Sequence, residues 1–218
     1  MRCWLLRCLL VLAFVSAQSG NAQPLVSEGL IDLREWDFSR KGEVKLDGRW
    51  NFYWQSLRAP AALDAQPKDR FEFPGIWNDA FSDHEELNGQ GFATYEARVL
   101  LDKDLEMVSF ELPDFYCSYS LWVNGKQVAV NGEVGTSRSE SVPQWLPKTI
   151  VVKATDTLQL VLHVSNFQHK RGGSNDHIYL GLPDQLYQKR EKAVVTNMVL
   201  FAGLLFIGAF FVVLFAFA

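Results

Sequence analysis

The feature that most limits how this chain can fold is the apolar run that closes it, from Ala193 to Ala218, which contains no charged residue. A helix needs about 20 mainly apolar residues to cross the hydrocarbon core of a bilayer. A helix that is apolar on every face is rare in the core of a soluble protein. The run therefore predicts a transmembrane helix over residues 193–218.

Residues 1–22 have the pattern of a secretory signal peptide, with Arg2 and Arg7 around a short basic start, then an apolar run and small residues. Cleavage is expected after Ala22 or after Ala17. A retained anchor is the alternative, although the apolar stretch is shorter than a span requires. The signal peptide predicts that residues 23–192 lie in the periplasm or extracellular space and that the closing helix lies in the inner (cytoplasmic) membrane.

The basic residues Lys189, Arg190 and Lys192 precede the closing helix, against the usual excess of positive charge on the cytoplasmic side, so this orientation depends on the signal peptide. Because the sequence stops within the apolar run, we expect it to be the front part of a longer membrane protein. A single-pass anchor is the alternative. Three parts are predicted: a signal peptide over 1–22, an exported domain over 23–188 and a first transmembrane helix over 193–218.

The charge of the exported part excludes one class of partner. Without Arg2 and Arg7 the 21 basic residues become 19 against 25 acidic ones, which leaves a net charge of about −6. No basic stripe is present to neutralise phosphates, so nucleic-acid binding is not expected. After signal cleavage Cys117 is the only cysteine, so the stability of the domain must come from packing rather than from an internal disulfide.

The region between the two apolar ends is predicted to be all-β. Apolar and polar residues alternate in "RWNFYW", "TYEARVLL" and "TLQLVLHVSNF", as in half-buried strands. The pair Asn124-Gly125 between two apolar runs predicts a hairpin, because a type I′ turn needs positive φ at both central residues. Short strands separated by frequent turns indicate a β-sandwich or jelly roll, followed here by the transmembrane α-helix. Residues 133–147 are polar and predicted to form a long loop.

Five motifs occur in an order that resembles a known family: "LDGRWNFYW" (46–54), "FPGIWN" (73–78), "GFATYEARVLL" (91–101), "LWVNGKQVAVNGEVG" (121–135) and "LVLHVSNFQHKRGG" (160–173). They resemble the extracellular sensor region of bacterial seven-transmembrane receptors with diverse intracellular signalling modules. The same skeleton is similar to the sugar-binding, galactose-binding-like jelly roll of family 2 glycoside hydrolases. The resemblance implies a periplasmic ligand-binding jelly roll, seven membrane helices and a cytoplasmic output module. The sequence ends in the first helix, so any enzymatic output would lie beyond residue 218.

The polar loop "SNFQHKRGGSNDH" (165–177) follows a predicted strand and offers three kinds of site. His169 and His177 lack the short spacing and third ligand of a zinc site, and Asn175 and Asp176 fall short of the ligands that calcium takes. No nucleophile elbow or pair of catalytic carboxylates stands out. Binding remains, because this loop would lie on the rim of the sandwich with mixed donors and acceptors. The alternative is that Asn166 and His169 only cap the strand while Lys170 and Arg171 are solvated.

Trp77, followed by Asn78, and Trp145 lie in predicted loops and are candidate stacking platforms for a sugar ring. The predicted ligand-binding residues are Trp77, Asn78, Trp145, Asn166, His169, Arg171 and Asn175. No catalytic residue, metal site or cofactor is predicted. The chain is expected to be the non-enzymatic, ligand-sensing part of a membrane receptor that binds a carbohydrate or small carboxylate, with a homodimer left open. The alternatives are the sugar-binding module of a membrane-anchored glycan-processing enzyme and an envelope protein without a small ligand.

Overall fold

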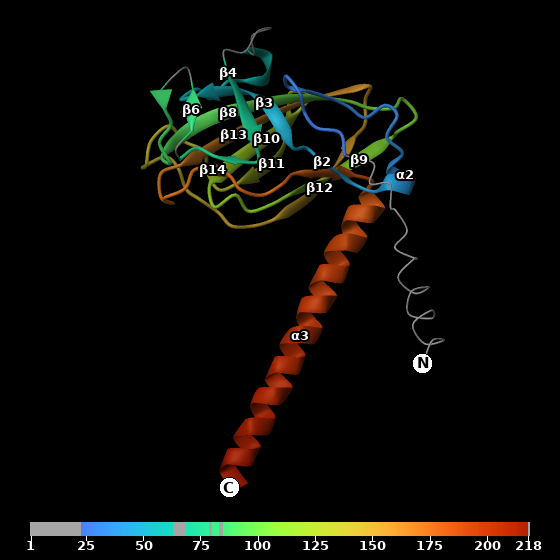
Figure 1. The fold of residues 1–218 in the computed structure, drawn as a ribbon, viewed down its shortest axis with the longest axis vertical. Coiled ribbons are helices and arrows are strands. Elements are labelled where there is room, and N and C mark those ends of the chain that lie inside the picture. The colour runs from blue at the N-terminus through green and yellow to red at the C-terminus, as the bar shows by residue number, and fades with distance from the viewer. Residues whose placement is uncertain (1–22, 63–68, 79, 83–84, 218) are drawn as a thin grey trace, which may run out of the picture.

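The structure, a computed structural model, describes residues 23–62, 69–78, 80–82 and 85–217. Over these residues it is a β-sandwich with a long helix at its carboxyl end (Figure 1). The predicted fold class is confirmed: two mainly antiparallel sheets in a jelly roll, followed by an apolar α-helix. The predicted signal peptide, residues 1–22, lies outside the described residues.

The larger sheet is seven-stranded and has the order β11-β10-β13-β8-β3-β4, with β1 paired in parallel to the end of β8. Its strands are β1 (Leu30–Asp32), β3 (Gly48–Trp54), β4 (Asp69–Phe73), β8 (Gly91–Leu100), β10 (Ser118–Val123), β11 (Lys126–Asn131) and β13 (Thr157–Asn166). The long strands β8 and β13 pair over their whole length and form the centre of the sheet.

The smaller sheet has the order β12-β9-β15-β2 and packs against the first. Its strands are β2 (Val44–Lys45), β9 (Met107–Leu112), β12 (Lys148–Lys153) and β15 (Tyr179–Gly181). Two short ribbons join β5 (Gly75–Ile76) to β14 (Gly173–Ser174) and β6 (Phe81–Ser82) to β7 (Glu85–Glu86). A short helix, α2 (Phe38–Lys41), and a 3₁₀ turn, η2 (Pro60–Ala62), complete the sandwich.

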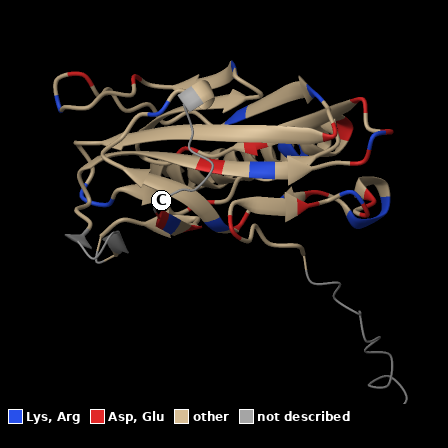
Figure 2. Ribbon diagram, turned by 90° about the horizontal axis from the view of Figure 1, so that it is seen from above, with Lys and Arg blue, Asp and Glu red and all other residues tan. Residues whose placement is uncertain are grey.

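The core follows from the alternation seen in the sequence, because successive side chains of a strand point to opposite faces. Leu158, Leu160, Leu162 and Val164 of β13 are all buried, as the alternation predicts. Trp50, Phe52, Phe73 and Tyr95 pack around one another as tilted and edge-to-face pairs. Charged residues lie mostly in loops and at strand ends, while most of the length of the strands carries none (Figure 2).

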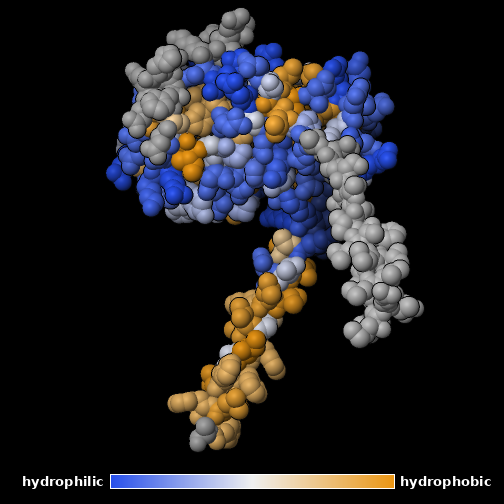
Figure 3. Space-filling view, viewed as in Figure 1, coloured by the Kyte–Doolittle hydropathy of each residue, from blue (hydrophilic) through white to orange (hydrophobic). Residues whose placement is uncertain are grey.

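Helix α3 (Pro183–Phe217) is long and apolar enough to cross a membrane, by length and composition. Its first turns are hydrophilic and adjoin the sandwich, and its remaining length is apolar (Figure 3). The first turns are docked: Leu186 is buried, and the Gln185 side chain donates to the carbonyl oxygen of Phe38 at 2.7 Å. Lys189 is paired with Glu43 at 3.3 Å and with Glu111 at 2.8 Å.

Candidate functional site

A cavity of about 340 Å³ opens at the end of the sandwich where β13 leads into the loop at 167–172. It is lined by Ile76, Phe115, Tyr116, His169, Lys170, Arg171, Gly172, Gly173 and Asn175. Three of the predicted ligand-binding residues, His169, Arg171 and Asn175, therefore share one cavity. A second cavity of about 330 Å³, lined by residues of 34–39 and 102–105 and by Leu182, contains none of the predicted residues.

Asn166 holds the loop in shape from below. It is the last residue of β13 and is buried, and its amide nitrogen donates to the carbonyl oxygens of Gly89, His169 and Arg171 at 2.6, 2.7 and 3.2 Å. Its amide oxygen accepts from the backbone nitrogen of His169 at 3.0 Å. Both ends of the amide are thus engaged by the protein, so in this structure Asn166 supports the cavity wall and does not line it.

Asn78 ties the same loop to the neighbouring segment. Its amide donates to the carbonyl oxygen of Lys170 at 3.0 Å and accepts from the backbone nitrogen of Gly172 at 3.2 Å. Because these bonds fix the backbone between two cavity-lining residues, Asn78 has a positioning role here.

Trp77 lies under the loop with no exposed surface. Its indole nitrogen donates to the Tyr95 hydroxyl at 2.6 Å, and its ring meets Trp54 edge-to-face. A Cβ atom on Gly172 would lie 2.4 Å from the Trp77 ring, and one on Gly173, whose φ is +87°, would lie 2.3 Å from the carbonyl oxygen of Gly75. The Gly-Gly pair therefore allows close packing of the loop on Trp77, and the indole has no free face for a ligand in this structure.

The cavity wall includes an aromatic pair that the sequence analysis did not single out. The ring of Tyr116 stacks on His169, with centroids 5.4 Å apart and planes inclined by 20°. Tyr116 adopts φ of +57° and is 45% exposed. The only indication of Tyr116 in the sequence was that "DFYCS" (114–118) lies between two predicted strands, because the loops at one end of a sandwich lie close together.

Lys170 and Arg171 make the charge of this cavity positive. Both are exposed, and none of the nine lining residues is acidic. The Cys117 thiol lies behind the wall and donates to the carbonyl oxygen of Gly173 at 3.5 Å. Burial raises the pKa of this thiol to about 12, so it remains protonated at neutral pH. Cys117 therefore acts as a small buried residue that holds the loop.

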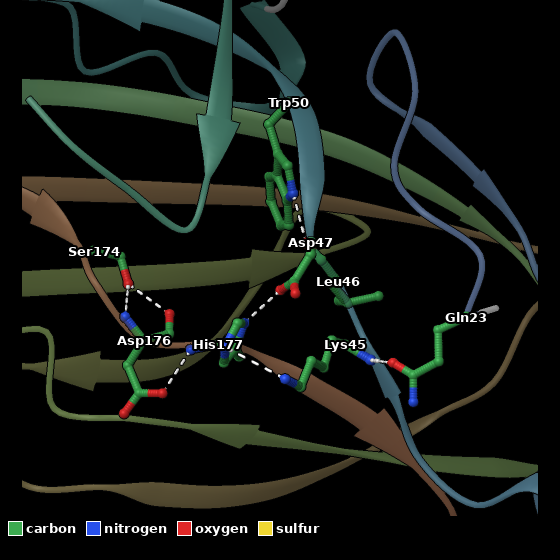
Figure 4. Close-up of polar contacts among 8 residues, drawn as sticks. All are labelled: Gln23, Lys45, Leu46, Asp47, Trp50, Ser174, Asp176 and His177. Carbon is green, nitrogen blue, oxygen red and sulfur yellow. Dashed lines mark hydrogen bonds and ion pairs between the residues drawn. The ribbon is translucent and has the colours of Figure 1, made fainter. Parts of the chain in front are cut away.

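Trp145, the other candidate platform, is 59% exposed and does not line this cavity. His177, at the end of the loop, is engaged elsewhere: its Nδ1 lies 2.7 Å from Oδ1 of Asp47 and its Nε2 lies 3.4 Å from Nζ of Lys45 (Figure 4). Among the described residues no group of three or more His, Cys, Asp or Glu side chains is placed to hold a metal ion.

Comparisons with known proteins give similarity to solved structures alone. No protein-family model matches the chain, and no curated protein matches it. Similar solved structures include a β-glucuronidase of Faecalibacterium prausnitzii (17% identity, TM-score 0.45, 58% of this chain and 21% of that chain). Also similar is a glycosyl hydrolase family 2 member of Bacteroides cellulosilyticus (14% identity, TM-score 0.48, 64% of this chain and 20% of that chain). A third is a β-glucuronidase of Ruminococcus gnavus (17% identity, TM-score 0.46, 65% of this chain and 29% of that chain). The matched part thus spans 20–29% of the length of these proteins.

Proposed function

We propose that this chain is a membrane-anchored ligand-binding module whose ligand is a carbohydrate or small molecule that carries a carboxylate. The observation that carries the proposal is the cavity itself, which combines two cations, a stacked aromatic pair and a close-packed glycine backbone. His169, Arg171 and Asn175 are the proposed contacts among the predicted residues. Asn78, Asn166 and Trp77 hold the cavity in shape.

The chemistry of the lining favours an anionic ligand. An arginine guanidinium binds a carboxylate through two parallel hydrogen bonds. The amide of Asn175 supplies a donor and an acceptor suited to hydroxyl groups. The lining residues include no carboxylate, whereas hydrolysis of a glycosidic bond uses a pair of them. These features favour binding over catalysis at this cavity.

The proposed role is sensing. In this proposal residues 1–22 direct export, residues 23–188 lie outside the cytoplasm, and residues 193–218 form the first membrane span of a receptor. One short segment joins the cavity to the membrane helix: Asn175 lines the cavity, β15 follows at Tyr179–Gly181, and α3 begins at Pro183. A ligand that binds one arrangement of this segment better than another would shift the receptor equilibrium by that difference in affinity.

The test uses the full chain in detergent and three probes: D-glucuronate, D-glucose and acetate. Glucuronate has both hydroxyl and carboxylate groups, and each of the others has one kind. A ligand at one hundred times its Kd stabilises the folded state by about 2.7 kcal/mol, which for a domain of this size raises Tm by roughly 5–10 °C. We expect the largest rise with glucuronate and a smaller rise at high salt, because Arg171 is exposed.

Two variants separate binding from folding. Arg171→Ala removes an exposed side chain and should abolish the glucuronate shift while the Tm without ligand stays unchanged. Asn166→Ala leaves the carbonyl oxygens of Gly89, His169 and Arg171 without the Asn166 donor, and the first of these belongs to a buried residue. It should therefore lower the stability without ligand by about 1–3 kcal/mol, seen as a lower Tm. If no probe raises Tm, or if Arg171→Ala itself fails to fold, the proposed site is wrong. Turnover of chromogenic glycosides would favour the enzyme alternative.

A further inference from the structure

The strand β12 and the loop before it carry apolar side chains that the sandwich leaves uncovered. Val142, Trp145 and Leu146 are 50%, 59% and 49% exposed, and Val151 of β12 is 37% exposed. Trp145 is the one exposed tryptophan among the described residues. With Lys153, which ends β12, these residues are called the β12 edge below. β12 is the outermost strand of its sheet, and among the described residues its far side pairs with no strand, although β11 of the larger sheet lies close to it.

The β12 edge is a structured surface. Glu133 and Val142 exchange both backbone hydrogen bonds, at 2.8 and 2.9 Å. The backbone nitrogen of Gly132 donates to the Gln144 side chain at 3.2 Å, and the ammonium of Lys148 donates to the carbonyl oxygen of Val130. These bonds hold the loop against the end of β11. The exposed tryptophan is therefore presented from a fixed backbone.

The contacts of α3 with the smaller sheet set how far this surface lies from the bilayer that α3 would span. Lys189 is paired with Glu111 of β9 and with Glu43, so the outer face of the smaller sheet lies level with this residue of α3. The apolar run begins at Ala193, four residues later. Four residues of helix span about 6 Å, and the headgroup layer on each side of a bilayer is roughly 5–8 Å thick. The outer face of the smaller sheet therefore lies at the level of the lipid headgroups when α3 spans a bilayer.

The β12 edge belongs to that same side of the sandwich. α3 contacts both β9 and β12. In Figure 1 β12 lies along the lower side of the sandwich, from which α3 leaves. The register of β12 with β9 places Val151 and Lys153 on the same outer face as Glu111, which binds Lys189.

We propose that the β12 edge contacts the surface of the membrane that α3 spans, with Trp145 in the headgroup layer and Lys153 facing anionic lipid. Tryptophan is enriched at this level of a membrane because its ring is apolar and its N–H is polar. Lysines extend an ammonium to the headgroups from an apolar stem. β12 itself contains no acidic residue. The proposal depends on the membrane span of α3 and is independent of ligand binding in the cavity.

The test measures whether lipid reaches Trp145. The full chain is reconstituted in vesicles of phosphatidylcholine and phosphatidylglycerol with lipids brominated either near the headgroup or deep in the acyl chain. Bromine quenches tryptophan emission on contact. We expect the shallow position to quench more than the deep one, and Trp145→Phe to lose the quenchable fraction. Trp36→Phe is the matched control, because Trp36 is only partly exposed and its indole nitrogen donates to the carbonyl oxygen of Gly42 at 3.1 Å, and it should keep that fraction.

Each other outcome overturns the proposal in a recognisable way. An unchanged quenchable fraction in Trp145→Phe means that lipid does not reach the β12 edge. If the intensity of Trp145 emission changes with the protein-to-lipid ratio and bromine has no effect on it, the surface contacts a second copy of the chain and not lipid. Release of the chain by alkaline carbonate means that α3 does not span the bilayer, which removes the basis of the proposal without affecting the ligand-binding test.

Discussion

At the scale of single residues, several polar side chains of this protein are used to hold backbone segments. Asn166 and Asn78 satisfy the carbonyl and amide groups of the loop that forms the cavity wall. Buried polar groups without partners cost free energy, so such bonds define the shape of the loop. The same residue types that suggest a ligand site in a sequence are also those that close loops.

His163 gives a prediction about pH. It lies on the outer face of β13, nearly buried, with its Nε2 2.7 Å from the carbonyl oxygen of Arg58 and its ring next to Trp122. Burial lowers the pKa of His163 below the usual 6.5, although the bond to Arg58 opposes this. The unfolded chain then binds more protons below pH 6.5 than the folded chain does. The contribution of His163 to the free energy of unfolding should therefore be fully present above about pH 6.5, and it should be lost as the pH falls towards the lowered pKa.

The measurement is Tm between pH 7.5 and 5 for the wild type and for His163→Gln, whose amide can still donate to the carbonyl oxygen of Arg58. The variant should be less sensitive to acid than the wild type. His169→Gln, on the exposed loop, is the matched control and should keep the sensitivity of the wild type. Equal slopes for the wild type and His163→Gln would contradict the assignment.

Among the predicted site residues, the sequence placed several in one loop but did not show the direction of each side chain. His169, Arg171 and Asn175 line the cavity, as expected of a rim. Trp77 and Asn166 are buried beneath it, because the alternation of a strand does not show which loop will close over its end. Tyr116 joins the cavity from a segment about fifty residues away in the sequence, and no local pattern states that contact.

At the scale of elements, local turn chemistry was a reliable guide. Asn124 and Gly125 join β10 to β11 with φ of +48° and +78°, as the Asn-Gly pair predicts. The alternating strands β8 and β13 also pair as the central strands of the larger sheet. The short ribbons β5–β14 and β6–β7 were not predicted, because two-residue strands carry no periodicity that a sequence could show.

Replacing Gly125 by alanine tests this turn. A Cβ atom there would meet nothing within 4 Å, so the change acts through the positive φ alone. We expect Gly125→Ala to lower stability by about 1 kcal/mol, which corresponds to roughly 2–4 °C in Tm. Gly125→Asn should cost less, because asparagine tolerates this conformation. Equal losses for the two variants would show that φ is not the cause.

At the scale of the whole molecule, the sandwich and helix α3 form one continuous structure. A chain of polar contacts follows the segment from the cavity towards α3: Ser174 bonds to Asp176, and His177 bonds to Asp47 and lies next to Lys45 (Figure 4). Tyr179 of β15 then lies under the ammonium of Lys189, 3.5 Å from the ring centre. A displacement of the cavity loop would thus reach the first turns of α3 through packed side chains.

If this junction is stiff, the length of helix between Lys189 and Ala193 sets the distance of the sandwich from the membrane. A polar helical heptad inserted between Arg190 and Glu191 adds about 10 Å and rotates the sandwich by only about 20°. This lift exceeds the headgroup layer, so Trp145 should lose most of its quenching by shallow brominated lipid. The insertion combined with Trp145→Phe gives the baseline, and resistance to alkaline carbonate shows that α3 is still inserted. Quenching that persists after the insertion would mean that the sandwich bends back to the membrane, because the polar turns of α3 are then a hinge rather than a rigid spacer.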